Sequence, residues 1–280
     1  MYSHITLGID GGVAHIRLAR PERMNTLGVG PGSSRDEIAD AMATADKDDS
    51  VGCLLLTAEG RAFCAGGDLT GAEPTETAYD EFRFVQQVDE FCAAVRQVRK
   101  PIVAGVNGLC LGAGMGLVAQ CDLVVAGDDA RFGLIEGRIG HPGATDLVPI
   151  IGGAWAKFLI LTGELIDAPL AERIGLVLTV IPAAELEARV TALARRIAAV
   201  PREAAVLNKA GVDAVTDAMG RQAGRLAGRA YDVTTKATAK LATAPDGRRF
   251  EDIVREEGVA GLKKARDSQF TGSWLRGTGQ

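Results

Sequence analysis

Three short apolar segments constrain the fold of this chain most strongly. They are CLLLTA (53–58), PIVAGVNG (101–108) and DLVVAG (122–127), each bounded by residues that favour turns. Such segments are typical of strands that are buried on both faces, as in parallel sheets. A helical pattern over 33–48 precedes them, and two more lie between them, over about 77–98 and in a shorter stretch that starts near Ala113. Strands that alternate with helices predict an α/β fold rather than a sandwich.

The two ends of the chain differ in pattern. Near the N-terminus, HITLGID and VAHIRLA alternate apolar and polar residues around Gly11 and Gly12, which predicts a β-hairpin. Beyond residue 182 the pattern is almost wholly helical, over 183–199, 203–219, about 221–242 and 248–266. We therefore expect a core over 1–202 and a helical region over 203–280.

Composition excludes several classes of protein. The chain has 31 Lys and Arg against 36 Asp and Glu in 280 residues, a net charge of −5, and its basic residues are scattered. This balance is a poor match to a nucleic-acid partner. We find no apolar run of membrane-spanning length and no signal pattern in MYSHITLGID, so we expect a cytoplasmic protein with no membrane span.

Cysteine and histidine spacings give no sign of a metal site. The five cysteines form no CxxC pair and lie mostly in apolar runs, so we expect reduced core thiols. The three histidines, His4, His15 and His141, form no HExxH or Cys/His cluster. A GxSxG elbow and a Walker loop are absent as well.

The segment LCLGAGMGLVAQCD (109–122) has an unusually bare backbone, with three glycines and an alanine at 112–116. A dinucleotide site would need G-x-G-x-x-G, but the last position is Leu117. A tight packing turn is a second interpretation. The third is an oxyanion site, in which small residues at a helix start let a ligand approach free N–H groups.

A second segment, GRAFCAGGDL (60–69), also follows a strand and also places small residues before an acid. Loops at the ends of adjacent strands can each donate one N–H to the same oxygen. Such a pair stabilises an enolate or a tetrahedral intermediate.

These segments resemble the crotonase (enoyl-CoA hydratase/isomerase) superfamily. The resemblance rests on GRAFCAGGDL, on KPIVAGVNGLCLGAGMGLVAQCDLVVA (100–126) and on ARFGLIEGRIGHPGA (130–144), in that order. It extends from residue 18 to residue 270. It implies a spiral of ββα units with a helical C-terminal region, assembled as a homotrimer or a dimer of trimers.

The resemblance also implies an acyl-CoA substrate from fatty acid metabolism and no further cofactor. Carried over by position, the oxyanion N–H groups belong to Ala65 and Ala113. Residues 65–68 (Ala65, Gly66, Gly67 and Asp68) would hold the coenzyme by main-chain contacts. Other candidate contacts are Arg20, Arg23, Met24, Phe250, Lys263, Lys264 and Arg266. The segment 71–82 is interpreted as a loop at the acyl pocket.

One catalytic position departs from the family pattern. In hydratases of the family, a glutamate stands two residues after the last glycine of the glycine-rich loop. Counted from Gly114, that position in this chain is Gly116. The second family glutamate, in FG-x-x-E, is present as Glu136. Hydration is served by two carboxylates, whereas one carboxylate suits a proton shuttle. We therefore expect isomerase-like chemistry, with a pKa of Glu136 raised by burial.

Two alternatives stay open on the sequence. His141 and Asp146 follow Glu136 closely and, if they face the pocket, they could serve a hydrolase or lyase reaction. The chain could also bind acyl-CoA without turning it over, because one scaffold hosts many functions.

Overall fold

The computed structural model describes residues 2–69, 77–270 and 272–276, and it contains two sheets. The larger has the order β1-β2-β3-β5-β7-β10, with β1 antiparallel to β2 and the other pairs parallel. The smaller has the order β4-β6-β8-β9, with only β9 antiparallel. The strands are β1 (Ile5–Asp10), β2 (Val13–Leu18), β3 (Cys53–Ala58), β4 (Ala62–Cys64), β5 (Ile102–Val106), β6 (Leu109–Leu111), β7 (Leu123–Gly127), β8 (Arg131–Gly133), β9 (Ile166–Asp167) and β10 (Thr179–Ile181).

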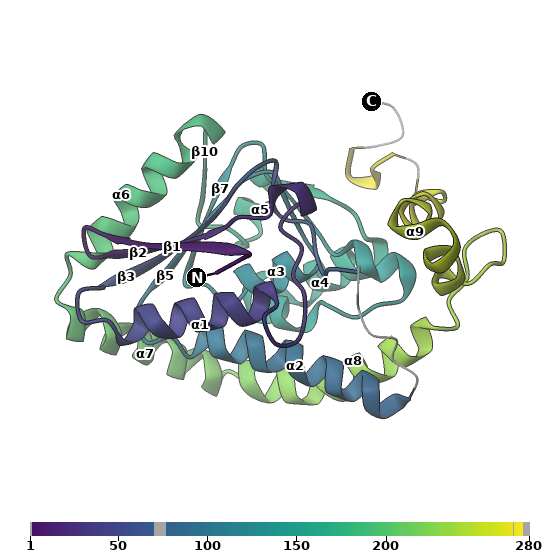
Figure 1. The fold of residues 1–280 in the computed structure, drawn as a ribbon, viewed down its shortest axis with the longest axis horizontal. Coiled ribbons are helices and arrows are strands. Elements are labelled where there is room, and N and C mark those ends of the chain that lie inside the picture. The colour runs from purple at the N-terminus through teal and green to yellow at the C-terminus, as the bar shows by residue number, and fades with distance from the viewer. Residues whose placement is uncertain (1, 70–76, 271, 277–280) are drawn as a thin grey trace.

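The helices alternate with pairs of strands. In chain order they are α1 (Ser34–Lys47), α2 (Ala78–Arg96), α3 (Ala113–Val118), α4 (Val148–Thr162), α5 (Ala168–Arg173), α6 (Leu186–Ala198), α7 (Arg202–Ala218), α8 (Arg221–Ala239) and α9 (Phe250–Asp267). The short 3₁₀ turns are η1 (Pro21–Arg23), η2 (Ile135–Ile139), η3 (Thr145–Leu147), η4 (Ala183–Glu185) and η5 (Trp274–Arg276). Three times in succession one strand enters the large sheet, the next enters the small sheet, and a helical segment follows (Figure 1). The predicted α/β class and spiral of ββα units are confirmed.

The central strands of the large sheet, β3 and β5, are buried on both faces. Along β3, Leu54 and Leu56 pack into the main core beneath α1, while Cys53 and Leu55 pack against α6. Helix α6 lies on one side of this sheet, with α1 and α2 on the other (Figure 1). Because successive side chains in a strand point to opposite faces, a continuous apolar run is what a doubly covered sheet requires.

Several local predictions are confirmed. Gly11 and Gly12 connect β1 to β2 with φ of 55° and 77°, the positive values that a tight hairpin turn needs. The side chain of Ser33 accepts a hydrogen bond from the N–H of Asp36 at the start of α1. Four of the five cysteines are buried and all five are free.

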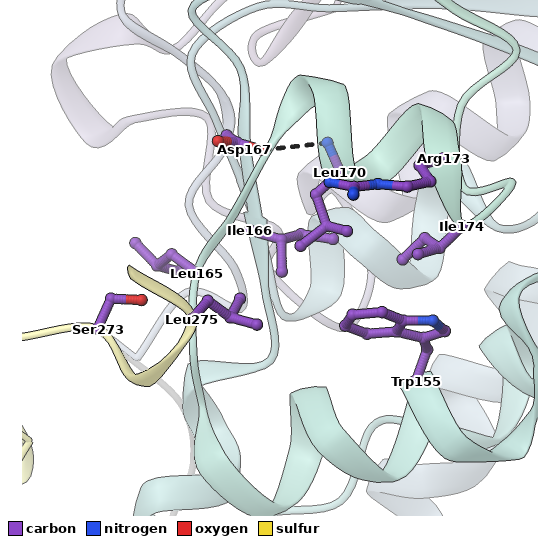
Figure 2. A pocket seen from close by; sticks show the side chains of 9 residues that line it. All are labelled: Trp155, Leu165, Ile166, Asp167, Leu170, Arg173, Ile174, Ser273 and Leu275. Carbon is purple, nitrogen blue, oxygen red and sulfur yellow. Dashed lines mark hydrogen bonds between the residues drawn. The ribbon is translucent and has the colours of Figure 1, made fainter. Parts of the chain in front are cut away.

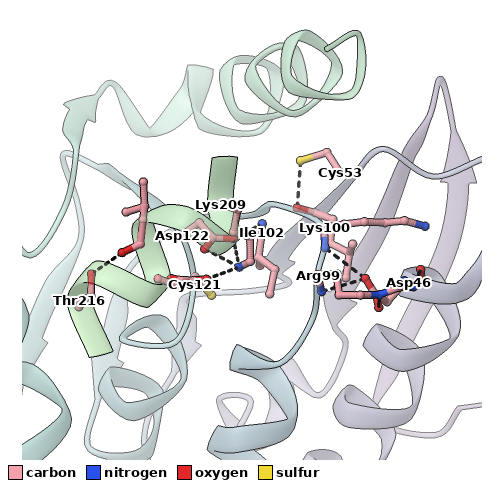
Figure 3. Close-up of polar contacts among 12 residues, drawn as sticks. Asp46, Cys53, Arg99, Lys100, Ile102, Cys121, Asp122, Lys209 and Thr216 are labelled. Carbon is pink, nitrogen blue, oxygen red and sulfur yellow. Dashed lines mark hydrogen bonds and ion pairs between the residues drawn. The ribbon is translucent and has the colours of Figure 1, made fainter. Parts of the chain in front are cut away.

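Helix α7 is tied to the large sheet by an ion pair. The Lys209 Nζ lies 2.5 Å and 2.6 Å from the two carboxylate oxygens of Asp122 (Figure 3). The same carboxylate accepts a hydrogen bond from the N–H of Ile102, the first residue of β5. This contact fixes where the helical region leaves the core. The predicted division at residues 202 and 203 coincides with the start of α7 and stays a prediction.

Other local predictions are corrected. Helices α4 and α5 have no counterpart among the elements predicted above. The glycines in GGAW (152–155) and those earlier in the chain obscure the helical period there. Residues 78–82, interpreted as a loop, belong to α2, whose capping box joins Thr77 and Asp80; residues 71–76 lie outside the described residues.

One segment meets the length and polarity of a membrane span, contrary to expectation. It is Thr145–Thr162, with a mean hydropathy of 1.3. Helix α4 is interrupted within it at Gly152, whose φ and ψ of 74° and 160° are not helical. The continuous helix after this kink is about 15 Å long, half of a bilayer core. The segment therefore does not form an unbroken spanning helix.

Two glycines on α3 provide a matched test of the packing. A Cβ at Gly114 would lie 2.8 Å from both the Cβ and the carbonyl oxygen of Cys64 on β4, whereas one at Gly116 would meet nothing within 4 Å. We expect Gly114→Ala to lower the free energy of unfolding by about 1–3 kcal/mol through overpacking. Gly116→Ala should raise it by about 0.5–1 kcal/mol because alanine favours helix. Urea unfolding followed by tryptophan fluorescence measures both, and equal effects would contradict this packing.

Candidate active site

Glu136 lies on η2, the turn that follows β8. Its Oε2 is buried and has no hydrogen-bond partner among the described residues. A Cβ built on Gly112 would lie 3.0 Å from Oε2, and one on Gly143 would lie 2.6 Å from Oε1. The carboxyl group is therefore flanked by two bare stretches of backbone. Burial raises the pKa of Glu136 to about 7, opposed weakly by the charge of Arg266.

Helix α3 begins next to this carboxyl. Gly112 has a φ of 49° and donates its N–H to Gly133 on β8 at 2.9 Å, which turns the chain from β6 into the helix. Ala113 is the first residue of α3. First-turn N–H groups have no acceptor within their own helix, so Ala113 remains a candidate donor.

The other expected donor, Ala65, is corrected. Its N–H donates to the carbonyl of Met24 at 3.0 Å and is therefore engaged. The next residue, Gly66, accepts a hydrogen bond from the N–H of Leu27, and the N–H of Asp68 donates to the carbonyl of Leu27. In this parallel pairing the N–H of the residue between them, Gly67, points away from the neighbouring segment. The alternation of backbone hydrogen bonds along this segment makes Gly67, rather than Ala65, the candidate donor. A sequence does not show that alternation.

Gly116 occupies an open position on α3. It lies one helical turn beyond Gly112 on α3, and its N–H donates to the carbonyl of Gly112 at 3.1 Å. Nothing lies within 4 Å of a Cβ built there. The position at which hydratases of the family carry their other glutamate therefore faces open space, and no other side chain of the described residues fills it.

His141 and Asp146 are held by structural contacts. The backbone N–H of His141 donates to the Glu136 carbonyl at 3.0 Å, and burial lowers the pKa of its imidazole to about 4. Asp146 lies 3.8 Å from Nε of Arg225 on α8. Burial raises the pKa of Asp146, and Arg225 opposes the rise. A neutral imidazole and a paired carboxylate are weak candidates for a second acid–base pair.

The candidate coenzyme contacts are in different environments. Arg20 and Arg23 lie 3.4 Å and 3.7 Å from the carboxylate of Asp68, so these three residues gather beside the 65–68 loop. Phe250 is buried in a cluster with Ile139 and Ile253, and its contact with the coenzyme stays a prediction.

The basic residues of α9 also differ in their surroundings. Arg266 is mostly buried and pairs with Asp267, whereas Lys263 and Lys264 are exposed.

A cavity of about 450 Å³ lies elsewhere, between α4, β9, α5 and the turn η5 (Figure 2). Trp155 and Leu275 line it, and Asp167 beside it caps α5 by accepting from the N–H of Leu170. It includes none of the predicted site residues. Over the described part of the chain, no group of three or more His, Cys, Asp and Glu side chains is placed to hold a metal ion.

Comparisons with known proteins identify the family of the chain. The family model "Enoyl-CoA hydratase/isomerase" matches residues 8–247. A probable enoyl-CoA hydratase of Mycobacterium leprae is 37% identical over 278 residues, which are 95% of this chain and 98% of that one. The 1,2-epoxyphenylacetyl-CoA isomerase of Escherichia coli is 31% identical over 256 residues, 86% and 97% of the two chains.

A solved structure gives the same result. The crystal structure of an enoyl-CoA hydratase/isomerase from Xanthobacter autotrophicus Py2 matches with a TM-score of 0.88 and 29% identity, over 97% of this chain and 100% of that one. The chain belongs to the enoyl-CoA hydratase/isomerase family, the crotonase superfamily of the sequence analysis. It is an acyl-CoA enzyme of that family.

The raised pKa of Glu136 has a measurable effect on stability. The unfolded chain ionises this carboxyl near 4.5 and the folded chain near 7, so stability is lost as the pH rises between these values. We expect Glu136→Gln to be more stable than wild type by about 3 kcal/mol at pH 8 and nearly equal to it at pH 4. Urea unfolding at several pH values measures the difference. The same difference at both pH values, or one equal to that of the exposed-site control Glu185→Gln, would contradict it.

Proposed function

We propose that this protein moves the double bond of an enoyl-CoA thioester, with Glu136 as the sole proton carrier. The observation that supports this most is the pairing of one buried carboxyl, with a pKa near 7, and a vacant position at Gly116. A carboxyl with that pKa exchanges protons readily near neutral pH. The cytoplasmic location and the place in fatty acid metabolism stay predictions.

The proposed reaction needs one base and one oxyanion site. The thioester oxygen would accept hydrogen bonds from the N–H groups of Gly67 and Ala113. Ionised Glu136 would remove a proton from C2 of a 3-enoyl thioester, which leaves a dienolate with its charge on that oxygen. The same carboxyl would return the proton to C4, so that the double bond moves to C2–C3. No atom is gained or lost, and Glu136 ends ionised as it began.

Hydration is the less favoured reaction. It would need a second group to hold and activate water, and Gly116 offers none. The relatives' names include both a hydratase and an isomerase, so the family alone leaves the reaction open. The low pKa of His141 and the ion pair of Asp146 likewise disfavour a hydrolase or lyase built on those residues.

Glu136→Gln tests the proposal directly. We expect it to lower kcat for conversion of a 3-enoyl-CoA to the conjugated 2-enoyl-CoA by about 10²–10⁴-fold, because the amide cannot carry the proton. The wild-type rate should rise with pH through about 7, as the carboxyl ionises. Ultraviolet absorbance of the conjugated product measures both.

The control and the alternatives use the same assay. Glu185→Gln, on the exposed side chain that pairs with Arg189, should keep the wild-type rate. Rapid hydration of a 2-enoyl-CoA by wild type would contradict the single-glutamate reaction. Binding of both thioesters without turnover of either would instead favour the non-catalytic acyl-CoA binding protein.

We also propose that α7 lies between copies of the chain in a homotrimer or a dimer of trimers. Its 17 residues include none that is fully buried. Val212, Val215 and Met219 share a face and are 68%, 62% and 83% exposed. An amphipathic helix with an uncovered apolar face is typical of a subunit contact.

A charge on this face should weaken the assembly. We expect Val215→Asp to shift wild-type trimers or hexamers toward monomers, because an unpaired carboxylate would be buried in the contact. Ile9→Asp, the same kind of change at an exposed apolar residue of β1, should leave the assembly intact. Light scattering after size exclusion measures the mass. A monomeric wild type would contradict the proposal.

A further inference from the structure

The turn that carries Glu136 is held by the arginine two residues beyond it. Arg138 donates from Nε to the carbonyl of Thr162 at 3.0 Å, and from a terminal nitrogen to Asp267 at 3.0 Å. Its guanidinium lies 4.1 Å from the centre of the Phe270 ring. Only 12% of the side chain is exposed. One side chain thus joins η2 to the end of α4 and to the end of α9.

Two glycines make this arrangement possible. A Cβ at Gly163, which has a φ of 61°, would lie 2.6 Å from Nε of Arg138. A Cβ at Gly137 would lie 1.9 Å from the Ile160 carbonyl oxygen. The backbone of η2 therefore packs directly on α4, and the arginine passes over the bare end of that helix. The last carbonyls of a helix favour a cation there.

The contacts of Arg138 lead, through Asp267, to Arg266, whose charge acts on the Glu136 carboxyl. Asp267 pairs with both Arg138 and Arg266, and Arg266 is the charged residue whose field acts on the Glu136 carboxyl. Lys157, the only titratable residue of α4, is exposed. The end of α9 therefore contributes both the anchor for Arg138 and the charge that faces Glu136.

We propose that Arg138 is a positioning residue for Glu136, because it ties η2 to α4 and α9 and so keeps the carboxyl buried between Gly112 and Gly143. Its catalytic consequence rests on the proposed function. Its structural consequence does not, since burial of the carboxyl can be measured without a substrate. Lysine keeps the positive charge but cannot make both hydrogen bonds and the ring contact together.

The experiment measures the titration of Glu136 and the kinetics in the same variants. Carboxyl ¹³C NMR of glutamate-labelled protein, with the Glu136 signal assigned by its loss in Glu136→Gln, should give a pKa near 7 in wild type. In Arg138→Lys we expect the pKa to be lower by about one unit or more, because water reaches the carboxyl. We expect kcat to fall about tenfold to a hundredfold, with KM changed by less than about threefold.

Two further variants, Phe270→Leu and Arg189→Lys, distinguish a positioning role of Arg138 from an unrelated effect of the substitution. Phe270→Leu removes the ring from a 40% exposed position without changing charge, and it should shift the pKa and kcat in the same direction by less. Arg189→Lys, in an exposed ion pair on α6, should change neither. A wild-type pKa of Glu136 in both Arg138→Lys and Phe270→Leu would overturn the positioning role. A wild type that does not isomerise, with the pKa shifts still present, would overturn only the proposed reaction.

Discussion

The buried carboxyl of Glu136 is the constraint on which the rest of the site depends. A carboxyl group without a hydrogen-bond partner at Oε2 is costly to ionise, and its pKa near 7 expresses that cost. The surrounding glycines, Gly112 and Gly143, leave space that side chains would fill. An ionisable group is therefore held in a place where a simple structural role would favour a neutral or apolar residue.

The small sheet brings the parts of this site together. Strands β4, β6 and β8 are parallel neighbours, and each leads at its C-terminal end to one part of the site. They lead respectively to the loop of Gly67, to the start of α3 and to the turn of Glu136. Ligand sites commonly lie at such ends in α/β folds, because the loops there converge. Gly114 lets α3 approach β4 closely enough for the first two parts to meet.

Sequence patterns predicted the hairpin, the buried strands and most helices, since these depend on local period and turn residues. They failed at α4, where Gly152 interrupts the helix, and they could not predict the small sheet, whose strands are too short for a period. The motifs predicted Glu136, Ala113 and Gly116 as site positions, which stay predictions. The candidate donor moves from Ala65 to Gly67 only because the Ala65 N–H is bonded to Met24 and the pairing with Leu27 leaves the Gly67 N–H unused, which motifs do not show. The role of Arg138 depends on contacts with residues far along the chain, which spacing does not reveal.

Transfer of a labelled hydrogen tests the single-carboxyl account most directly. A 3-enoyl-CoA deuterated at C2 would be converted in ordinary water, and the product's C4 position would be analysed by NMR or mass spectrometry. If one buried carboxyl removes and returns the same proton, deuterium should appear at C4. Product that carries only solvent hydrogen at C4, even in the first turnovers, would contradict the claim that the carboxyl returns the same proton that it removes.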